Sequence, residues 1–443
     1  MGDIAVLLET IKSIILDFQE APLETGVPRR LRIETVPGKA TTCIGVRRGG
    51  KSTYLFQVIQ RLLDSGVSRQ NVLYLNFFDD RLHSLTKDNL GLIAEAYYFL
   101  HPEKKNSETV YCFFDEIQAA PGWEPFVDRL MRTEKCEVYL SGSSAGMLSK
   151  EIATQMRGRA LSWEMFPFSF REFLDCKGIE SEGGLSTKRQ LLIRKSFEEY
   201  WRTGGFPEVA GLSRHLRIKI HQEYFHTILF RDLIERHDVS HPKALTDLAH
   251  RLVETTASLY SINSLTRYLK SLGHKAPKPA VSDYLEWFED AYFLFTVRKF
   301  DASSVRRNTN PKRIYCIDHA MVASVSPGIL LNSGHLFENL VFIALRRIYP
   351  EICYYRTEAG REVDFIVLTG DRLHMLVQVC ESMVETQTRK RETAALSEAM
   401  AELGLKTGTI VTRNEHERIK VKAGTIEVVP AWRFLLDLPE TLQ

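Results

Sequence analysis

One eight-residue segment constrains the fold of this 443-residue chain more than any other. Residues 45–52 read Gly-Val-Arg-Arg-Gly-Gly-Lys-Ser and fit the pattern G-x-x-x-x-G-K-[ST] at every fixed position. A short β-branched run, residues 41–44, precedes the segment, and a helical pattern, residues 52–65, follows it. Glycines let successive backbone N–H groups converge on phosphates, and the N-terminus of the next helix attracts the same anion. The segment therefore predicts a strand–loop–helix unit of an α/β fold that binds a nucleotide.

The residues of this loop have separate expected roles. Lys51 would neutralise the β- and γ-phosphates of ATP, and the Ser52 hydroxyl would bind Mg²⁺. We therefore expect ATP and Mg²⁺ as cofactors. The residues expected to surround the phosphates are Gly45, Val46, Arg47, Arg48, Gly49, Gly50, Lys51, Ser52 and Thr53.

A second motif supplies the carboxylates that such a site needs. Residues 111–116 read Tyr-Cys-Phe-Phe-Asp-Glu, an apolar strand that ends in two acids. Burying adjacent carboxylates is costly unless a cation neutralises them. Asp115 would hold the Mg²⁺ shell, and Glu116 would orient and deprotonate the attacking water. One strand candidate, residues 71–76, lies between the two motifs, which fits the division of P-loop proteins with an inserted strand and a glutamate base.

The next strand candidate, residues 137–141, runs into a glycine and two serines. A polar residue at the tip of the strand beside Asp115 can hydrogen-bond the γ-phosphate or the attacking water. Ser143 or Ser144 could do this, and Ser144 enters the predicted catalytic set. A plain turn at the end of the strand is the alternative.

Two arginines, Arg157 and Arg159, precede the strand candidate at residues 161–165. They are placed like an arginine finger that reaches the nucleotide of a neighbouring subunit. This position predicts a homo-oligomer. The alternative is a pair of arginines on a solvated helix end.

Composition excludes several classes of protein. With 58 basic and 56 acidic residues, the formal charge is +2, which neither demands nor excludes nucleic acid. No apolar run approaches the ~20 residues of a membrane span, and the acidic N-terminal segment is unlike a signal peptide. The seven cysteines contain no C-x-x-C, so we expect neither disulfides nor a zinc site and place the chain in the cytoplasm.

The elements predict three domains. Strands alternate with helices up to about residue 170, which is typical of a parallel sheet. A helical region follows, and strand character returns after residue 296. The predicted domains are an ATPase core with an N-terminal helix (1–175), a helical lid and winged-helix region (176–320) and a nuclease-like α/β domain (321–443).

Together, these motifs resemble a known family. The segments GVRRGGKST, FFDEIQAAPGWE, YLSGSSAGMLS, QMRGRALSWEMFPFSFREF and GGFPEV look like the bacterial and archaeal AAA-type ATPases with a C-terminal domain of unknown function. The resemblance covers residues 20–430 and implies the roles given above for the loop and the two acids. It also suggests a similarity to signalling ATPases whose lid carries Gly-x-Pro near the nucleotide base. Residues 205–207 match that pattern, so the resemblance implies that Pro207 contacts the base.

The middle of the chain contains a candidate winged helix. Helices are expected at residues 252–260, 264–272 and 280–292, followed by two strands joined by a basic turn at residues 305–307. Such a unit would place a helix in the major groove of DNA and a wing on the phosphates. The alternative is a protein-packing module, because the third helix carries four acids that would face phosphates unfavourably.

The C-terminal region resembles the PD-(D/E)xK nuclease core. Glu338 stands for the helix acid and Asp364 for the strand acid, but Gln378 and Cys380 stand where Glu and Lys are expected. An amide and a thiol cannot replace a metal-binding carboxylate and an ammonium group. We therefore expect a degenerate nuclease fold retained for binding or assembly.

The sequence as a whole predicts a Mg²⁺-dependent ATPase that acts on or with DNA as a motor or remodeller. The alternative is a nucleotide-controlled signalling switch that binds protein partners. An active nuclease is disfavoured by Gln378 and Cys380.

Overall fold

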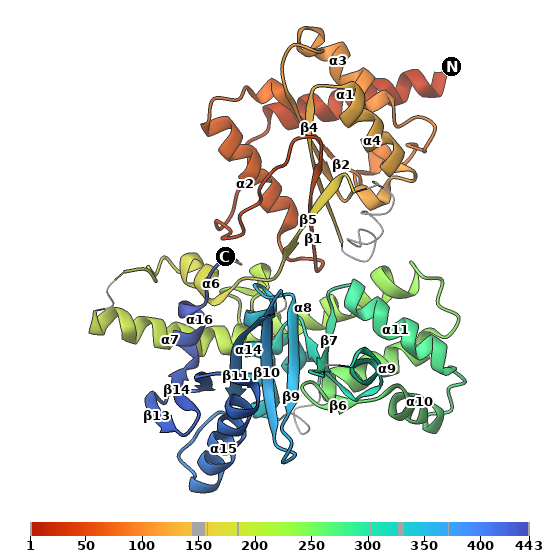
Figure 1. Cartoon of the computed structure of the whole chain (residues 1–443). Helices are drawn as coiled ribbons and strands as arrows, with labels where there is room; N and C mark the ends of the chain where they lie inside the picture. The colour runs from red at the N-terminus through yellow and green to blue at the C-terminus, as the bar shows by residue number, and fades with distance from the viewer. Residues whose placement is uncertain are drawn as a thin grey trace. The chain divides into compact units, whose positions relative to one another are not determined.

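The computed structural model describes residues 2–143, 156, 158–183, 186–301, 303–326, 332–370 and 372–441. Within it the chain forms two compact units, Met1–Met165 and Phe166–Gln443 (Figure 1). The predicted division into three domains stays a prediction.

The first unit is built on a five-stranded sheet in which every strand pairing is parallel. Its strand order is β2-β3-β4-β1-β5. The strands are β1 (Ala40–Gly45), β2 (Val72–Asn76), β3 (Val110–Asp115), β4 (Cys136–Ser143) and β5 (Ala160–Met165). This confirms the predicted parallel α/β sheet. It also shows that β4 is the strand inserted between the loop strand β1 and the acidic strand β3, whereas β2 lies at the edge.

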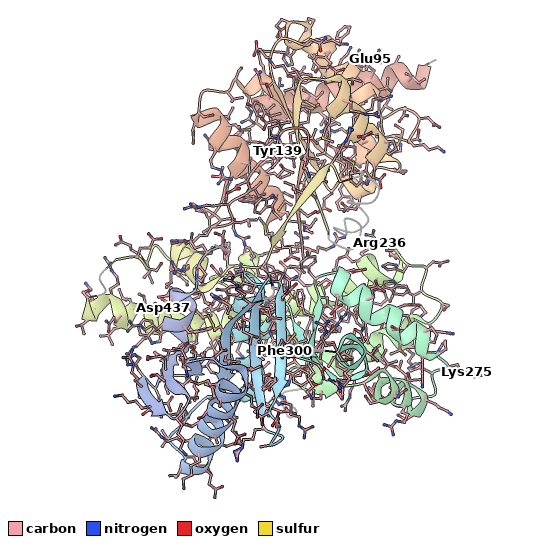
Figure 2. All side chains as sticks on the ribbon, in the orientation of Figure 1. Glu95, Tyr139, Arg236, Lys275, Phe300 and Asp437 are labelled. Carbon is pink, nitrogen blue, oxygen red and sulfur yellow. The ribbon has the colours of Figure 1, made fainter. Side chains whose placement is uncertain are left out.

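Helices cover this sheet and complete its core. They are α1 (Gly2–Glu20), α2 (Lys51–Asp64), α3 (Leu92–Leu100) and α4 (Trp123–Thr133). Phe113 of β3 stacks on Tyr139 of β4 with 4.5 Å between ring centroids, and Figure 2 labels Tyr139. Phe18 of α1 stacks on Tyr74 of β2 at the same distance. Burying side chains of this size contributes ~1.5–3 kcal/mol each, so the aromatic contacts hold the strands that carry the site.

The second unit contains a nine-stranded mixed sheet in the order β13-β14-β12-β11-β10-β9-β7-β8-β6. The strands are β6 (Leu259–Tyr260), β7 (Leu294–Lys299), β8 (Lys312–Cys316), β9 (Glu351–Arg356), β10 (Glu362–Thr369), β11 (Arg372–Val379), β12 (Thr407–Thr412), β13 (Glu417–Val421) and β14 (Gly424–Pro430). β7 pairs with β8 on one side and with β9 on the other. The strands expected for the winged helix and those expected for the C-terminal domain therefore form one continuous sheet.

Helices of the second unit lie before, between and after these strands. They are α6 (Phe170–Cys176), α7 (Thr187–Thr203), α8 (Arg214–Thr227), α9 (Pro242–Glu254), α10 (Ile262–Ser271), α11 (Lys278–Asp290), α12 (Ser304–Thr309), α13 (His319–Val325), α14 (Ser333–Arg346), α15 (Thr386–Leu403) and α16 (Ala431–Asp437). The long helix α15 packs on β10, β11, β12 and β14 (Figure 1).

Two local expectations for the middle region were wrong. The helix expected at residues 252–260 ends at Glu254, because Ala257 adopts a left-handed conformation (φ 62°) and the chain then enters β6. The basic turn expected at residues 305–307 is part of the short helix α12, whose first turn is capped by the Ser303 side chain.

All seven cysteines are free. Across the described ranges, no helix combines the length and the apolar character needed to cross a membrane.

Candidate functional site

The phosphate-binding loop lies where the sequence predicts it, between the end of β1 and the start of α2. Gly50 adopts a left-handed conformation (φ 95°) immediately before the helix. A Cβ atom at Gly45 would collide with the backbone carbonyl of Met165, and one at Gly49 would lie 3.1 Å from the carbonyl oxygen of Val46. Close packing of the backbone therefore requires glycine at these positions.

Lys51 is buried at the centre of the loop, with 5% of its surface exposed. Its ammonium group donates hydrogen bonds to the carbonyl oxygens of Gly45 and Val46, each at 3.1 Å. An ammonium group has three donors, so one remains for a phosphate oxygen. Ser52 and Thr53 lie in the first turn of α2, where backbone amides have no helical partner.

Asp115 ends β3 and is completely buried. One carboxylate oxygen accepts a hydrogen bond from the hydroxyl of Ser141, and the other accepts one from the hydroxyl of Tyr74 at 3.0 Å. Burial and the negative charge of Asp115 raise the pKa of Tyr74, so that hydroxyl stays protonated and remains a donor. A carboxylate has about four acceptor positions. The two donors therefore fix its orientation and leave positions for a cation or its water shell.

Glu116 follows in a left-handed conformation (φ 53°). For a residue with a side chain this costs ~1–3 kcal/mol and is found most often at functional sites. Its amide donates to the Ser141 hydroxyl at 3.3 Å, and its carboxylate accepts a hydrogen bond from Gln118 at 2.5 Å. Ser141 therefore contacts both acids of the motif.

The sheet brings the two motifs together. β1 and β3 both flank β4, and all three strands run parallel, so their carboxyl ends meet at one edge. Burial raises the pKa of the Cys43 thiol to about 12, and the charges of Lys51, Arg29 and Asp115 all act on that thiol. Lys51 of the loop and Asp115 of the acidic strand therefore both lie close enough to the buried Cys43 thiol to affect its pKa.

Of the other predicted catalytic residues, the structure describes only Arg159. Ser144 and Arg157 lie outside the described residues. Arg159 precedes β5, and its guanidinium binds the carboxylate of Asp128 on α4 at 3.0 Å. Arg132 binds the same carboxylate at 2.8 Å. In this chain Arg159 is therefore held by its own subunit.

Three residues of the site were not predicted from the sequence. Ser141 and Tyr74 orient Asp115, and Arg29 donates to the carbonyl of Gly49 at 2.7 Å. The sequence offered one indication for Ser141, which is a serine at the end of a mostly apolar strand candidate. Tyr74 is one aromatic residue among many, and Arg29 lies in a turn-rich segment far from the loop, so neither carried a signal.

Pro207, the predicted base contact, belongs to the second unit and begins a short 3₁₀ turn. The preceding Gly205 donates its amide hydrogen to the Asp318 carboxylate at 2.6 Å and accepts a hydrogen bond from the amide of Phe168 at 2.5 Å. A Cβ atom at Gly204 would collide with that same carboxylate. The Gly-Gly-Phe-Pro segment therefore has a packing reason for its glycines, and the base contact stays a proposal.

The nuclease-like residues also come together, around an arginine. Arg313 of β8 binds the carboxylates of Glu338 on α14 at 2.6 Å, Asp364 on β10 at 2.9 Å and Glu362 at 2.9 Å. The hydroxyl of Tyr315 donates to Glu338 at 2.6 Å. Burial and the charge of Asp364 raise the pKa of Glu338 to about 8, against the opposing effect of Arg313. A guanidinium thus contacts the acids that a metal ion would need.

Gln378 has a structural role in this cluster. Its side-chain oxygen accepts the amide hydrogen of Asp364 at 3.2 Å, and its side-chain nitrogen donates to the buried Glu392 at 2.8 Å. Cys380 lines the adjoining cavity of about 620 Å³. Within the described part of the chain, no group of three or more His, Cys, Asp or Glu residues is arranged to hold a metal ion.

Three regions of the chain match families of known proteins. Residues 37–174 match the family described as an AAA domain, and residues 194–329 and 333–434 match two domains of unknown function, DUF8612 and DUF4143. Among solved structures, the Walker-type ATPase PABY2304 of Pyrococcus abyssi is 14% identical, with a TM-score of 0.42, and the match covers 65% of this chain and 90% of that one.

Two curated relatives match much more of the chain. An uncharacterized protein of Haemophilus influenzae is 28% identical over 343 residues, which is 77% of this chain and 82% of the relative. The protein MJ1544 of Methanocaldococcus jannaschii is 33% identical over 447 residues, which is 98% of this chain and 96% of the relative. The chain therefore belongs to the same family as MJ1544, and its N-terminal part is an AAA-type P-loop ATPase domain.

Proposed function

We propose that the chain hydrolyses ATP in a Mg²⁺-dependent reaction at the carboxyl edge of the first unit's sheet. One observation carries the proposal: the loop that holds Lys51 and the strand that ends in Asp115 and Glu116 both flank β4 in one parallel sheet. An ammonium group, a fixed buried carboxylate and a second, less buried carboxylate are the groups that phosphoryl transfer to water requires.

Each residue has a role that follows from its position. The loop amides and Lys51 bind the phosphates. The hydroxyl of Ser52 and the carboxylate of Asp115 offer the oxygen ligands that Mg²⁺ prefers. A Mg²⁺ ion held by these two residues would supply positive charge against the negative charge that develops on the phosphates. Glu116, which follows β3 in a left-handed backbone conformation, accepts the proton of the attacking water.

The first test is the affinity for ATP in the presence of Mg²⁺. Lys51→Ala removes a charged hydrogen bond of ~1.5–3 kcal/mol, so the dissociation constant should rise roughly 10- to 100-fold. Isothermal titration calorimetry measures it. Lys87→Ala, which removes an exposed lysine of the same unit, is the control and should bind as the unchanged protein does. Equal affinities for both variants would refute the proposed phosphate site.

We further propose that Arg159, with Arg157, completes the site of a neighbouring subunit. Turnover per chain should then rise with protein concentration, and Arg159→Ala should lower the rate of the assembled protein about 10³-fold. Arg132→Ala is a matched control, because Arg132 pairs with the same Asp128 carboxylate but lies on α4. Similar rates for the two variants would contradict the proposal that Arg159 acts as an arginine finger. A rate per chain that is independent of dilution would contradict it as well.

We propose DNA as the partner of this ATPase, with a nucleotide-controlled protein switch as the alternative. The support is the order of elements in residues 242–316, which is helix, strand, two helices and a strand pair, as in a winged helix. The Nε of Arg306 in the wing donates to both carboxylate oxygens of Asp301, and this pairing favours the alternative. Duplex DNA should raise ATP turnover, with a steep decline as salt increases. Unchanged turnover would favour the switch.

A further inference from the structure

A cavity of about 610 Å³ lies within the second unit, away from both clusters described above. It is formed by the end of α7, the first turns of α8 and the short helix α13. Its lining is strongly basic, and no Asp or Glu belongs to it among the described residues. The residues that matter here are Arg202, Arg214, Arg217, His221 and His319.

The arginines of this cavity have few partners. Arg202 and Arg214 are exposed, and neither has an ion pair or a hydrogen-bonded side-chain partner in the part of the chain that the structure describes. Arg217 donates to the hydroxyl of Thr203, while its buried Nε has no acceptor among the described residues. Glu199, the acid whose charge acts on Arg217, is bound by Lys177 at 2.6 Å, and the charge of Asp318 acts on His221 and His319.

The three guanidinium groups act on one another. Burial lowers the pKa of Arg217, the charge of Glu199 opposes that effect, and Arg202 and Arg214 lower the pKa further. Two of these arginines lie in the first turn of α8, a 14-residue helix whose N-cap Ser213 makes no side-chain cap. Cations at a helix N-terminus oppose the helix dipole. An anion in the cavity would relieve both repulsions.

His221, a residue of the same wall, has one buried ring nitrogen without a partner among the described residues. It is 1% exposed, and its Nδ1 lies 3.0 Å from the hydroxyl oxygen of Ser324. That hydroxyl donates its own hydrogen to the carbonyl of Ala320 at 2.8 Å, so it accepts from Nδ1. Nε2 then carries a lone pair and has no partner among the described residues. Nε2 is itself buried, so His221 adds an unsatisfied acceptor to the packing of this wall rather than a direct contact with a ligand.

We propose that this cavity binds the phosphate groups of a small molecule of diphosphate or triphosphate size. The volume exceeds that of a single anion, and three convergent guanidiniums match several phosphate oxygens. The ring of Trp201 packs on His319 at 5.1 Å and lies 4.6 Å from the guanidinium of Arg413, so phosphate rather than base stacking supplies recognition. The proposal does not rest on ATP hydrolysis, because every residue belongs to the second unit.

The test uses the full chain with Lys51→Ala, which weakens the loop in the first unit. Calorimetry with pyrophosphate, tripolyphosphate, ADP and AMP should detect binding in this background. Adding Arg202→Gln and Arg214→Gln should weaken it by roughly 10-fold or more, since each lost charged hydrogen bond contributes ~1.5–3 kcal/mol. The control adds Lys195→Gln and Lys219→Gln, which remove two exposed charges from α7 and α8 outside the cavity. Thermal unfolding confirms that both variants are folded.

The ligands separate two sources of phosphate. Tighter binding of ADP than of pyrophosphate would identify a nucleotide, and the reverse order would identify a free polyphosphate; both support the cavity. No binding of any of the four in the Lys51→Ala background would overturn the proposal. The proposal would also be overturned if the control variant lost as much affinity as the arginine variant. Binding of duplex DNA without binding of any of the four phosphate compounds would overturn it too.

Discussion

Glu116→Gln should abolish ATP turnover while ATP affinity stays within about twofold of the unchanged protein. The carboxylate accepts a proton only in the transition state, so its loss removes a contribution of typically 10²- to 10⁴-fold in rate and none in ground-state binding. Phosphate release under saturating ATP and Mg²⁺ measures turnover, and calorimetry measures affinity. The amide keeps the size of the side chain, and the left-handed backbone at this position is unaffected.

A matched change elsewhere controls for the loss of one charge. Glu103→Gln alters an exposed carboxylate of the same unit and should turn over as the unchanged protein does. Wild-type rates in Glu116→Gln would show that another group is the base. Loss of affinity together with rate would show that Glu116 holds the nucleotide rather than activating water.

Arg313→Met should destabilise the second unit by ~3–5 kcal/mol, because it leaves buried carboxylates without their cation. Urea unfolding measures the free energy. Arg306→Met is the control: it breaks a two-oxygen contact with Asp301 on an exposed guanidinium, and surface pairs contribute ~1 kcal/mol or less. Adding Glu338→Gln and Asp364→Asn to Arg313→Met should restore most of the stability.

The loss of unfolding free energy in the Arg313→Met variant should also depend on pH. The pKa of Glu338 is about 8 in the folded chain, above the ordinary value of 4.5, so its contribution to stability is present at low pH and declines as pH rises between these values. Without Arg313 this pKa rises further. The variant should therefore be more destabilised at pH 8.5 than at pH 5.5. A loss equal to that of Arg306→Met at both pH values would contradict the role of Arg313 as the internal cation.

The same cluster bears on nuclease chemistry. Arg313 contacts Glu338 and Asp364, the two acids expected to hold Mg²⁺, and Gln378 holds a backbone amide and Glu392 rather than a metal. We therefore propose that the second unit does not cut nucleic acid. Cleavage in Mg²⁺ or Mn²⁺ that Asp364→Ala abolishes would overturn this.

Much of the first unit could be predicted because its information is local. The loop pattern, the β-branched run before it and the acids that end an apolar strand each lie within about eight residues, and backbone geometry dictates what such segments form. Alternation of strands and helices then gives a parallel sheet. The acidic strand, expected at residues 111–116, is found as β3 at Val110–Asp115.

The remaining features depend on contacts between distant segments. Arg313 reaches Asp364 across 51 positions, and Ser141 reaches Asp115 across 26. The spacing of apolar and polar residues along the sequence does not indicate contacts between residues so far apart. The strand β13 was not predicted: Glu417–Val421 is a five-residue strand at the edge of the sheet that pairs only with β14 among the described strands. The end of α9 depends on one left-handed residue, Ala257, whose type does not favour that conformation.

The continuous sheet of the second unit has a mechanical consequence. The hairpin of β7 and β8 is joined to β9 through Arg298 and Lys299, and Phe300 donates its amide hydrogen to Tyr354 at 2.7 Å (Figure 2 labels Phe300). Any pull on that hairpin along the strands loads these hydrogen bonds in shear and passes into β9 and β10. The hairpin and the C-terminal strands belong to one hydrogen-bonded sheet, so displacing the hairpin would strain its pairing with β9.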